Sequence, residues 1–480
     1  MQRLSKLMQR WRLGILLLLC CRLFLAAPLL AQSEGKTVTV TAENLAAAVA
    51  AAQAGDTIEV TGGIHKGPLE INKRLTLIGK NWPVIDGEFD GSVITINAPG
   101  SAISGFLIKN SGDSLDDQNS GIAVNAEHVL VENNRFEDTL FGIYLQKAHY
   151  SVVRANIITS KDLEVQRRGD PIRLWYSTDV LVEDNSVDQG RDVVLWYSER
   201  LTIRNNTITN GRYGLHFMYC DDAIIENNRM LDNSVGTFLM YSRRVTLRNN
   251  TIANNRGPSG YGIGLKDMDD ATVENNLILD NRVGIHLDTS PREVDSFGKY
   301  SGNVFAYNDI GVELMPSVRH NEFSGNSFVE NEEQVGVAGG GIIHENLWTV
   351  NGRGNYWSDY AGFDADGDGH GDIEYKSERL FENLMQAEPK LRLFIYSPAS
   401  NAIDFASKAF PMVKPQPKLV DERPYMTPMI PTDAPPLPQT NNQGWLWLAL
   451  ALLIVAFGLA ALPRMNRRRY QITPAVKGNK

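Results

Sequence analysis

The sequence repeats one short pattern, in which alternating apolar residues end at an asparagine and another apolar residue follows two positions later. VLVENNRF, LTIRNNTI, AIIENNRM and VTLRNNTI are four of its copies, and successive copies lie 21 to 29 residues apart. Units of this length with strand periodicity cannot bury their own apolar faces, so neighbouring units must stack on one another. The marker asparagines are Asn134, Asn156, Asn185, Asn206, Asn228, Asn250 and Asn276, with weaker copies at Asn303, Asn326 and Asn355.

A second apolar segment that begins with glycine follows many of the markers, as in GIYL, GLHF, GTFL, GIGL and GIHL. Each unit is therefore predicted to hold two short strands separated by turns at Asn and Gly. Strands stacked in parallel about 4.8 Å apart form one continuous apolar column, and the Asn amides of successive units can bond to one another. This predicts an all-β fold: a right-handed parallel β-helix over residues 32–360, capped at its start by an amphipathic helix at residues 42–54.

The two ends of the chain carry export and membrane signals. Residues 1–31 place basic side chains before an apolar run, which predicts a secretory signal peptide; an uncleaved membrane anchor is the alternative interpretation. Residues 445–462 hold no charge and precede an arginine cluster, which predicts one transmembrane helix with a basic cytosolic tail at residues 463–480. The body would then lie in the periplasm, anchored to the inner membrane.

The net charge and the cysteine content limit the classes of protein to which the chain can belong. The formal net charge of −9 argues against a nucleic-acid binder, because phosphate binding needs a basic surface. Two of the three cysteines lie in the signal peptide, so the exported chain keeps Cys220 alone and has no internal disulfide framework.

The register of the repeat separates inward from outward side chains, because successive residues of a strand alternate between its two faces. The predicted inward column is Leu174, Leu195, Phe217, Leu239, Leu265 and Leu287. The next residues along the chain, predicted to point outward, are Trp175, Trp196, Met218, Met240, Lys266 and Asp288. A corner row follows them, and with the two tryptophans it forms a predicted partner or ligand face: Trp175, Trp196, Tyr176, Tyr197, Tyr219 and Tyr241.

A set of soft ligands falls on this outward face. His216, Met218 and Cys220 alternate along one predicted strand, and Met240 lies one unit away. Imidazole, thioether and thiol are ligands that Cu(I) prefers, so these four residues are candidates for a transient copper contact. A methionine and aromatic patch covered by a partner or by the chain's own tail, or a platform for sugars, would produce the same pattern.

An acidic segment follows the repeat, within a predicted end cap at residues 361–388. Asp364, Asp366, Asp368 and Asp372 carry oxygens at the alternating spacing of a calcium loop, although Tyr375 replaces the usual final glutamate. We therefore expect a structural calcium ion or a plain Asp-Gly turn. Residues 389–444 are predicted to contain a helix that begins near Ser397 and Pro398, followed by a Pro-rich linker. The linker either spaces the chain or packs back along the solenoid or against a membrane partner.

The sequence gives little support for an enzyme. Sugar-cleaving β-helices need acidic or basic groups clustered on one outward face, whereas the pairs Asp221-Asp222 and Asp269-Asp270 fall at turns. Asp170-Pro171 lacks the His-Asp that would complete an epimerase motif. We therefore expect a non-enzymatic protein, with an exported carbohydrate-binding or carbohydrate-active β-helix as the alternative.

Two C-terminal segments resemble the NosD family: GNYWSDYAGFDADGDGHGDIEY and LFIYSPASNAIDFASKAFPMVKPQPKLVDERPYM. With the repeat, the resemblance extends over residues 36–429. It implies a periplasmic protein that works with an ABC-type ATPase and a membrane permease to assemble the copper-sulfur centre of nitrous oxide reductase. It also implies a small lipoprotein as the copper donor. ATP hydrolysis would belong to the partner ATPase, and no copper ligand of the family maps onto a fixed position here.

Overall fold

A computed structural model describes residues 35–41, 45–340, 343–377, 381, 384–385, 388–394, 397–409 and 417–431. Met1–Ile430 and Pro431–Lys480 form separate units, and every element named below belongs to the first. The predicted signal peptide (residues 1–31), transmembrane helix (445–462) and basic tail (463–480) lie outside the described residues. Among the residues that are described, no helix is both long and apolar enough to cross a membrane.

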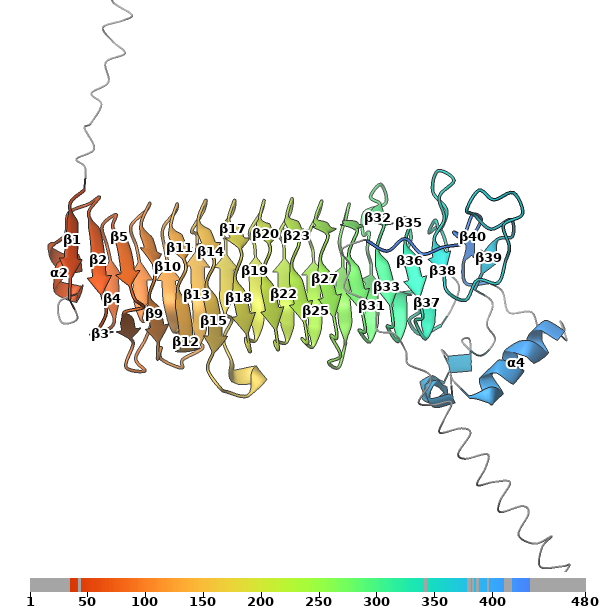
Figure 1. The fold of residues 1–480 in the computed structure, drawn as a ribbon, viewed down its shortest axis with the longest axis horizontal. Coiled ribbons are helices and arrows are strands. Elements are labelled where there is room, and N and C mark those ends of the chain that lie inside the picture. Colours follow the sequence, from red (N-terminus) through yellow and green to blue (C-terminus); the bar gives the residue numbers. More distant parts are fainter. Residues whose placement is uncertain are drawn as a thin grey trace, which may run out of the picture. The chain divides into compact units, whose positions relative to one another are not determined.

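The chain coils into a parallel β-solenoid of the right-handed type with about 13 turns, as predicted (Figure 1). Three parallel sheets form its walls, and we name them A, B and C. Sheets A and B contain 13 strands each, and sheet C contains 12. Sheet A contains β1 (Thr37–Val40), β2 (Thr57–Thr61), β5 (Thr76–Lys80), β8 (Ala102–Ser104), β11 (Leu130–Glu132), β14 (Val152–Arg154), β17 (Leu181–Glu183), β20 (Thr202–Arg204), β23 (Ile224–Glu226), β26 (Thr246–Arg248), β29 (Thr272–Glu274), β32 (Gly298–Ser301) and β35 (Asn321–Ser324).

Sheet B follows sheet A in each turn and contains β3 (Ile64–Lys66), β6 (Val84–Asp86), β9 (Leu107–Lys109), β12 (Arg135–Thr139), β15 (Ile157–Ser160), β18 (Ser186–Asp188), β21 (Thr207–Thr209), β24 (Arg229–Leu231), β27 (Thr251–Ala253), β30 (Leu277–Leu279), β33 (Val304–Ala306), β36 (Ser327–Val329) and β38 (Tyr356–Trp357). Sheet C contains β4 (Leu69–Ile71), β7 (Ile94–Ile96), β10 (Ser120–Val124), β13 (Phe141–Gln146), β16 (Ile172–Trp175), β19 (Asp192–Trp196), β22 (Tyr213–Met218), β25 (Val235–Met240), β28 (Tyr261–Lys266), β31 (Val283–Asp288), β34 (Ile310–Leu314) and β37 (Glu333–Val337).

Each turn thus holds three strands, whereas the sequence predicted two. The residue before each marker except Asn355 adopts a left-handed conformation, with φ of 56° at Asn205 and 57° at Asn227. This conformation, which Asn tolerates better than most residues, bends the chain just before the marker. The apolar run on either side of the marker is therefore split between sheets A and B.

The marker asparagines form a continuous buried ladder at the corner between sheets A and B, as predicted. Both the backbone N–H and the Nδ2–H of Asn206 donate to Oδ1 of Asn228, at 2.9 and 3.0 Å. Asn228 Nδ2 in turn donates to the carbonyl of Ile203 at 2.8 Å and to Oδ1 of Asn250 at 3.1 Å. Every amide therefore satisfies its own polar atoms and joins neighbouring turns where water is excluded.

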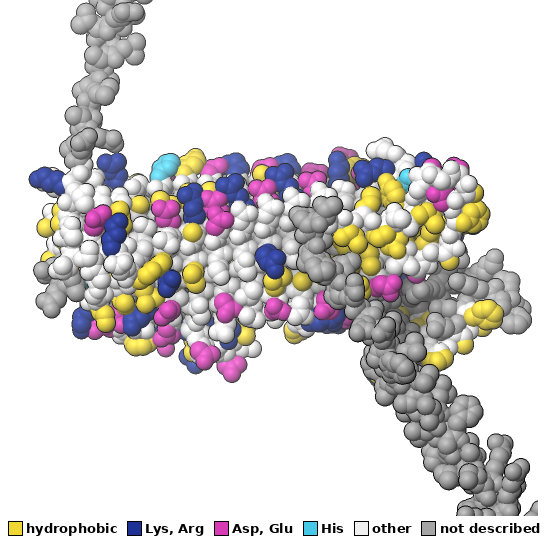
Figure 2. All heavy atoms as spheres, viewed as in Figure 1, with side chains coloured by type: hydrophobic (Ala, Val, Ile, Leu, Met, Phe, Trp, Pro, Cys, Tyr) yellow, Lys and Arg dark blue, Asp and Glu magenta, His cyan; other side chains and the backbone are white. Residues whose placement is uncertain are grey.

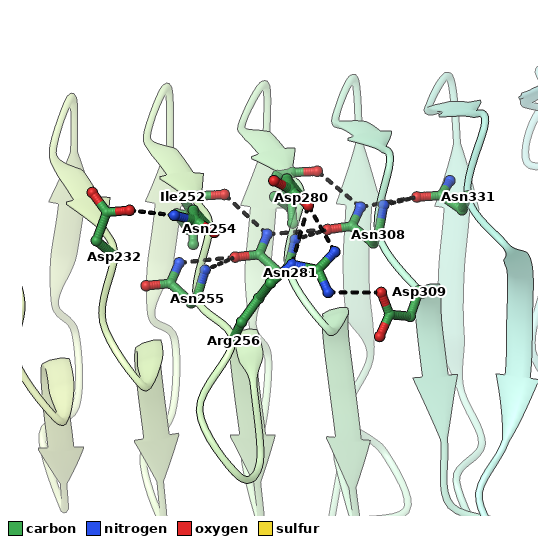
Figure 3. A network of polar contacts seen from close by, with 11 residues as sticks. Asp232, Ile252, Asn254, Asn255, Arg256, Asp280, Asn281, Asn308, Asp309 and Asn331 are labelled. Atoms are coloured by element: carbon green, nitrogen blue, oxygen red, sulfur yellow. Dashed lines mark hydrogen bonds and ion pairs between the residues drawn. The ribbon is translucent and has the colours of Figure 1, made fainter. Parts of the chain in front are cut away.

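A second asparagine ladder, which the sequence analysis missed, lies at the corner between sheets B and C (Figure 3). Its signal was present in the sequence, because each member lies five residues after a marker. Asn281 shows the pattern: its Oδ1 accepts from Asn255 Nδ2 at 2.8 Å, and its Nδ2 donates to Oδ1 of Asn308 at 3.1 Å. The members are Asn233, Asn255, Asn281, Asn308 and Asn331.

The interior and the outer face of sheet A both follow the register. The predicted inward column from Leu174 to Leu287 is completely buried. On the outside of sheet A, glutamate and arginine alternate from turn to turn, and Figure 2 shows basic and acidic side chains intermingled along the side where this sheet lies. Glu183 bonds Arg154 at 2.5 Å and Arg204 at 2.6 Å, and a slip of one turn would place like charges together. The row is Glu132, Arg154, Glu183, Arg204, Glu226, Arg248 and Glu274.

Separate elements close the ends of the solenoid. The short helix α2 (Leu45–Ala51) buries Leu45 and Val49 at the start, within the predicted cap. The last turn holds β38, and the antiparallel pair β39 (Tyr375–Lys376) and β40 (Val420–Asp421) follows it. The predicted helix is present as α4 (Pro398–Ala409), with Ser397 Oγ accepting from the Ser400 N–H at 3.4 Å. Two short 3-10 helices, η1 (Val165–Arg167) and η2 (Pro389–Phe394), complete the described elements.

Asp421 terminates the first asparagine ladder. Its Oδ2 accepts from the backbone N–H of Asn355 at 2.6 Å and from Trp357 Nε1 at 2.9 Å, and its Oδ1 accepts from Thr349 Oγ1 at 2.7 Å. Nearby, Lys418 and Glu333 form a buried ion pair with an Nζ–Oε1 distance of 2.6 Å. Residues 417–430 therefore pack back onto the solenoid, which was one of the predicted roles of the Pro-rich segment.

We expect the substitution Asn228→Ala to lower the free energy of unfolding by about 3 kcal/mol, because it leaves Asn206 N–H and the Ile203 carbonyl buried without partners. Guanidinium unfolding followed by circular dichroism measures this difference. Arg229→Ala, at the next and exposed position, is the control and should cost less than about 0.5 kcal/mol. Equal stability of the two variants would contradict a stabilising ladder.

We expect Asp421→Ala to open the last turn, because it removes the acceptor of three buried donors at once. Hydrogen exchange should rise by about 10-fold or more in β36 and β38 and stay unchanged in sheet strands of the first turns. Asp421→Asn keeps one oxygen and should have a smaller effect. The exposed neighbour Glu422→Ala should leave exchange unchanged, and uniform protection in Asp421→Ala would contradict the capping role.

Candidate functional site

Two outward rows of side chains run across sheet C, where β19, β22 and β25 lie side by side (Figure 1). The strand register aligns the predicted row Trp175, Trp196, Met218, Met240, Lys266 and Asp288. A parallel row two residues earlier contains Tyr144, Arg173, Val194, His216, Phe238, Gly264, His286 and Glu313. This face therefore gathers aromatic, thioether and imidazole groups from successive turns.

The aromatic residues pack as columns along the stack. The rings of Trp175 and Trp196 lie 5.7 Å apart between centroids. The four corner tyrosines all have left-handed backbones, and their rings stack at 4.9, 5.1 and 5.1 Å from one turn to the next. The predicted corner position of Tyr176, Tyr197, Tyr219 and Tyr241 is thus confirmed. Whether a partner or a ligand covers these rings stays a prediction.

His216 is the buried polar centre of the face, with only 8% of its side chain exposed. Its Nδ1 bonds Asp192 Oδ2 at 3.3 Å, and the rings of Trp196 and Tyr213 meet it edge-on with centroids at 5.3 and 4.9 Å. Nε2 of His216 and Nε1 of Trp196 are both buried and have no hydrogen-bond partner among the described residues. Two neighbouring rings thus each bury a polar atom whose hydrogen bond to water has not been replaced.

The charge on Asp192 fixes which nitrogen of His216 carries the proton. Burial by itself raises the pKa of Asp192, but the hydrogen bonds from His216 and Arg212 outweigh it and hold that pKa below its usual value. An ionised carboxylate only accepts hydrogen bonds, so Nδ1 of a neutral His216 ring donates to it. Nε2 then keeps its lone pair, which is the arrangement that carboxylate–histidine pairs use to present imidazole to a metal.

The two predicted methionines lie on the same outer face as this imidazole. Met218 is two residues from His216 on β22, so both point outward, and Met240 is the register partner of Met218 on β25. Both methionine side chains are half-buried. Three of the four predicted copper ligands are thus on one surface.

Cys220 was wrongly placed in that set. It is completely buried, and its Sγ donates to the Leu195 carbonyl at 2.9 Å inside the solenoid. The alternation assumed for the strand stops at Tyr219, whose left-handed φ of 56° turns the next side chain inward. The equivalent residues of neighbouring turns, Ser177, Ser198 and Ser242, are buried there too and would have revealed the inward position.

A buried ionic cluster adjoins the site, and the sequence analysis gave it no role. Asp170 accepts from Arg191 at 2.9 and 3.1 Å and lies 3.5 Å from Arg173. Burial raises the pKa of Asp170 to about 6, against the influence of Arg191. Arg173 is also surrounded by the rings of Phe141, Tyr144, Trp175 and Trp196, at 5.3 to 5.8 Å from their centroids. These charges are largely engaged with one another.

The acidic segment forms a local turn near the last strands. Oxygens of Asp364, Asp366 and Asp368 lie within 4.8 Å of one another, whereas Asp372 does not belong to this group. Asp372 instead accepts from the backbone N–H of Ala365 at 2.7 Å, and Asp364 accepts from Gly367 and Gly369 at 2.7 and 2.9 Å. Hydrogen bonds from Gly369 and Gly367 hold the pKa of Asp364 below its usual value. Calcium binding here stays a prediction.

Comparison with known proteins shows which proteins the chain resembles. The family described as "Periplasmic copper-binding protein (NosD)" matches residues 154–362. A Pseudomonas aeruginosa protein called "Probable ABC transporter binding protein NosD" is 29% identical over 379 residues, 76% of this chain and 87% of that protein. One of the same description from Stutzerimonas stutzeri is 36% identical over 137 residues, 28% of this chain and 30% of that protein. The chain is thus similar to NosD proteins over most of its length.

The residues matched by the NosD family include the whole cluster of His216, Met218 and Met240 and both tryptophans of the aromatic face. They end before the acidic turn that begins at Asp364. Among solved structures, the Dettilon tailspike protein resembles the chain with a TM-score of 0.47 and 14% identity, over 61% of this chain and 63% of that one.

We expect Cys220 to be unreactive in the folded protein. Burial raises the pKa of its thiol to about 12, so roughly one thiol in ten thousand is ionised at pH 8. Alkylation by iodoacetamide, followed by mass spectrometry of the Cys220 peptide, should be at least about 100-fold slower in native buffer than in guanidinium. Equal rates would show that the thiol reaches the surface.

Proposed function

We propose that this chain is a non-enzymatic periplasmic accessory protein of an ABC transporter, required for copper-centre assembly in nitrous oxide reductase. The family description as periplasmic and copper-binding, and the description of the relatives as ABC transporter binding proteins, support the setting. The observation that carries the proposal is the soft-donor cluster of His216, Met218 and Met240 on the outer face of sheet C. Copper is then cargo, passed between partners.

The chemistry of the cluster suits a carrier. Thioether and imidazole are neutral soft ligands that select Cu(I) over hard cations. The cluster contains no thiolate, which is the strongest of the soft ligands. It should therefore release Cu(I) faster than a site with a thiolate would. The proposed partners are a copper-donating lipoprotein, the permease and ATPase of the transporter, and the reductase that receives the metal.

The carbohydrate alternative draws on the same face, where Trp175 and Trp196 present adjacent rings. A catalytic site for sugars needs a free acid or base in an open position. Asp170 and Asp192 are the buried acids of this face, and both are bonded to arginines. This favours a binding protein over a sugar-cleaving enzyme.

Deleting the gene in its host tests the proposal. We expect reductase purified from the deletion strain to be made in normal amounts but to lack copper in its copper-sulfur centre, measured by metal content and visible absorption. The full-length chain supplied in trans should restore both. Reductase with normal copper from the deletion strain would contradict the proposal, and retention of the chain on an oligosaccharide column would favour the carbohydrate alternative.

A further inference from the structure

We propose that His216, Met218 and Met240 form a three-ligand Cu(I) site that Trp196 closes with its ring, and that Asp192 positions the imidazole. The inference rests on the proposed function, because it takes copper as the cargo. It names the site, the oxidation state and the residues that control access.

The register brings the three ligands within reach of one ion. Met218 and Met240 are paired on adjacent parallel strands, which lie about 4.8 Å apart. His216 is on the same face of β22, about 7 Å along the strand from Met218. Each methionine has three rotatable bonds before its methyl group, so both sulfurs can turn toward the imidazole without moving the sheet.

His216 supplies the ligand atom that lacks a partner in the protein. Its side chain is more than nine-tenths buried, Nδ1 bonds Asp192, and Nε2 on the other edge of the ring is without a partner among the described residues. Burying such an atom without compensation costs free energy, and a bound metal ion would supply the missing interaction. The Asp192 carboxylate itself is engaged by Arg212 and His216, which leaves it as a positioning residue.

Trp196 occupies the remaining side of the site. It is the register partner of Met218 on β19, opposite Met240, and its ring meets that of His216 at 87° with centroids 5.3 Å apart. Because two thioethers and a neutral imidazole leave the charge of Cu(I) uncompensated, an adjacent indole face stabilises the ion through a cation–π interaction. The same ring excludes water and the nitrogen or oxygen ligands that Cu(II) prefers.

Two other residues of the chain, His286 and Met315, serve as controls for the proposed copper ligands. His286 occupies the same row three turns away, where its Nδ1 bonds Glu313 at 2.7 Å and its ring stacks on Tyr261. In the other outward row His286 lies beside Lys266 and Asp288, which form an ion pair, so it lacks the pair of thioethers that His216 has. Met315 follows Leu314, the register partner of Leu287, and therefore continues the methionine row beyond Asp288.

Anaerobic Cu(I) titration of the full-length chain against a chromogenic chelator tests the site. We expect one Cu(I) per chain, with affinity about 100-fold or more weaker in His216→Ala and in the double variant Met218→Leu/Met240→Leu. His286→Ala and Met315→Leu should bind as the wild type does. The leucine variants preserve side-chain volume, so they test the ligands even if His216→Ala fails to fold.

Spectroscopy separates the roles of the surrounding residues. X-ray absorption of the Cu(I) form should show two sulfur ligands and one imidazole, and Asp192→Asn should lose imidazole scattering while the sulfurs remain, with affinity about 10-fold lower. Cu(I) should quench tryptophan fluorescence, and Trp196→Phe should remove most of that quenching while Trp175→Phe does not.

The outcomes distinguish this inference from the proposed function. If the wild type binds Cu(I) and the His216 and Met218/Met240 variants bind it equally well, the site is wrong although the accessory role stands. A wild type that restores the reductase in cells but binds no Cu(I) also overturns the site while keeping that role. If the chain fails to restore the reductase, the proposed function itself falls, whatever the titration shows.

Discussion

The buried asparagine ladder is the interaction on which the rest of the structure depends. Each amide donates and accepts between neighbouring turns, so that Asn206, Asn228 and Asn250 hold one another and the adjacent backbone. A shift by one residue would leave several of these atoms buried without partners, which costs more than most single contacts contribute. The ladder therefore enforces the register at every turn, and the corner serines and the second asparagine ladder repeat the device at the other two corners.

A fixed register turns residues that are distant in sequence into surfaces. Trp196, Met218 and Met240 come from three successive turns, yet the parallel pairing places them side by side on sheet C. The site thus needs no long loop and no mobile segment to assemble it. The same register also produces the alternating glutamate and arginine row of sheet A, whose pairs would become repulsive after a slip of one turn.

Much of the fold could be predicted from the sequence, because ladders and inward columns repeat with the chain and leave a periodic signal. The marker asparagines, the column from Leu174 to Leu287 and the corner tyrosines were predicted on that basis. The predictions failed where a single backbone angle, or a contact between turns, determines the position of a side chain or strand. The left-handed residue before nearly every marker splits one predicted strand between sheets A and B, and the left-handed Tyr219 turns Cys220 inward. The bond from Asp192 to His216 joins different turns, and periodicity does not reveal such a pair.

The inward position of Cys220 agrees with the proposed role of this face as a copper carrier. A thiolate beside Met218 would bind Cu(I) far more tightly than thioethers do, and in an oxidising compartment it would form disulfides. The corner that buries this thiol in a row of serines leaves imidazole and thioether as the soft donors of the His216 cluster. Neutral ligands hold a cuprous ion without cancelling its charge, so a partner that offers a thiolate or a carboxylate has a thermodynamic advantage. Transfer can then run toward the acceptor without any change in the solenoid, whose ladders make such a change expensive.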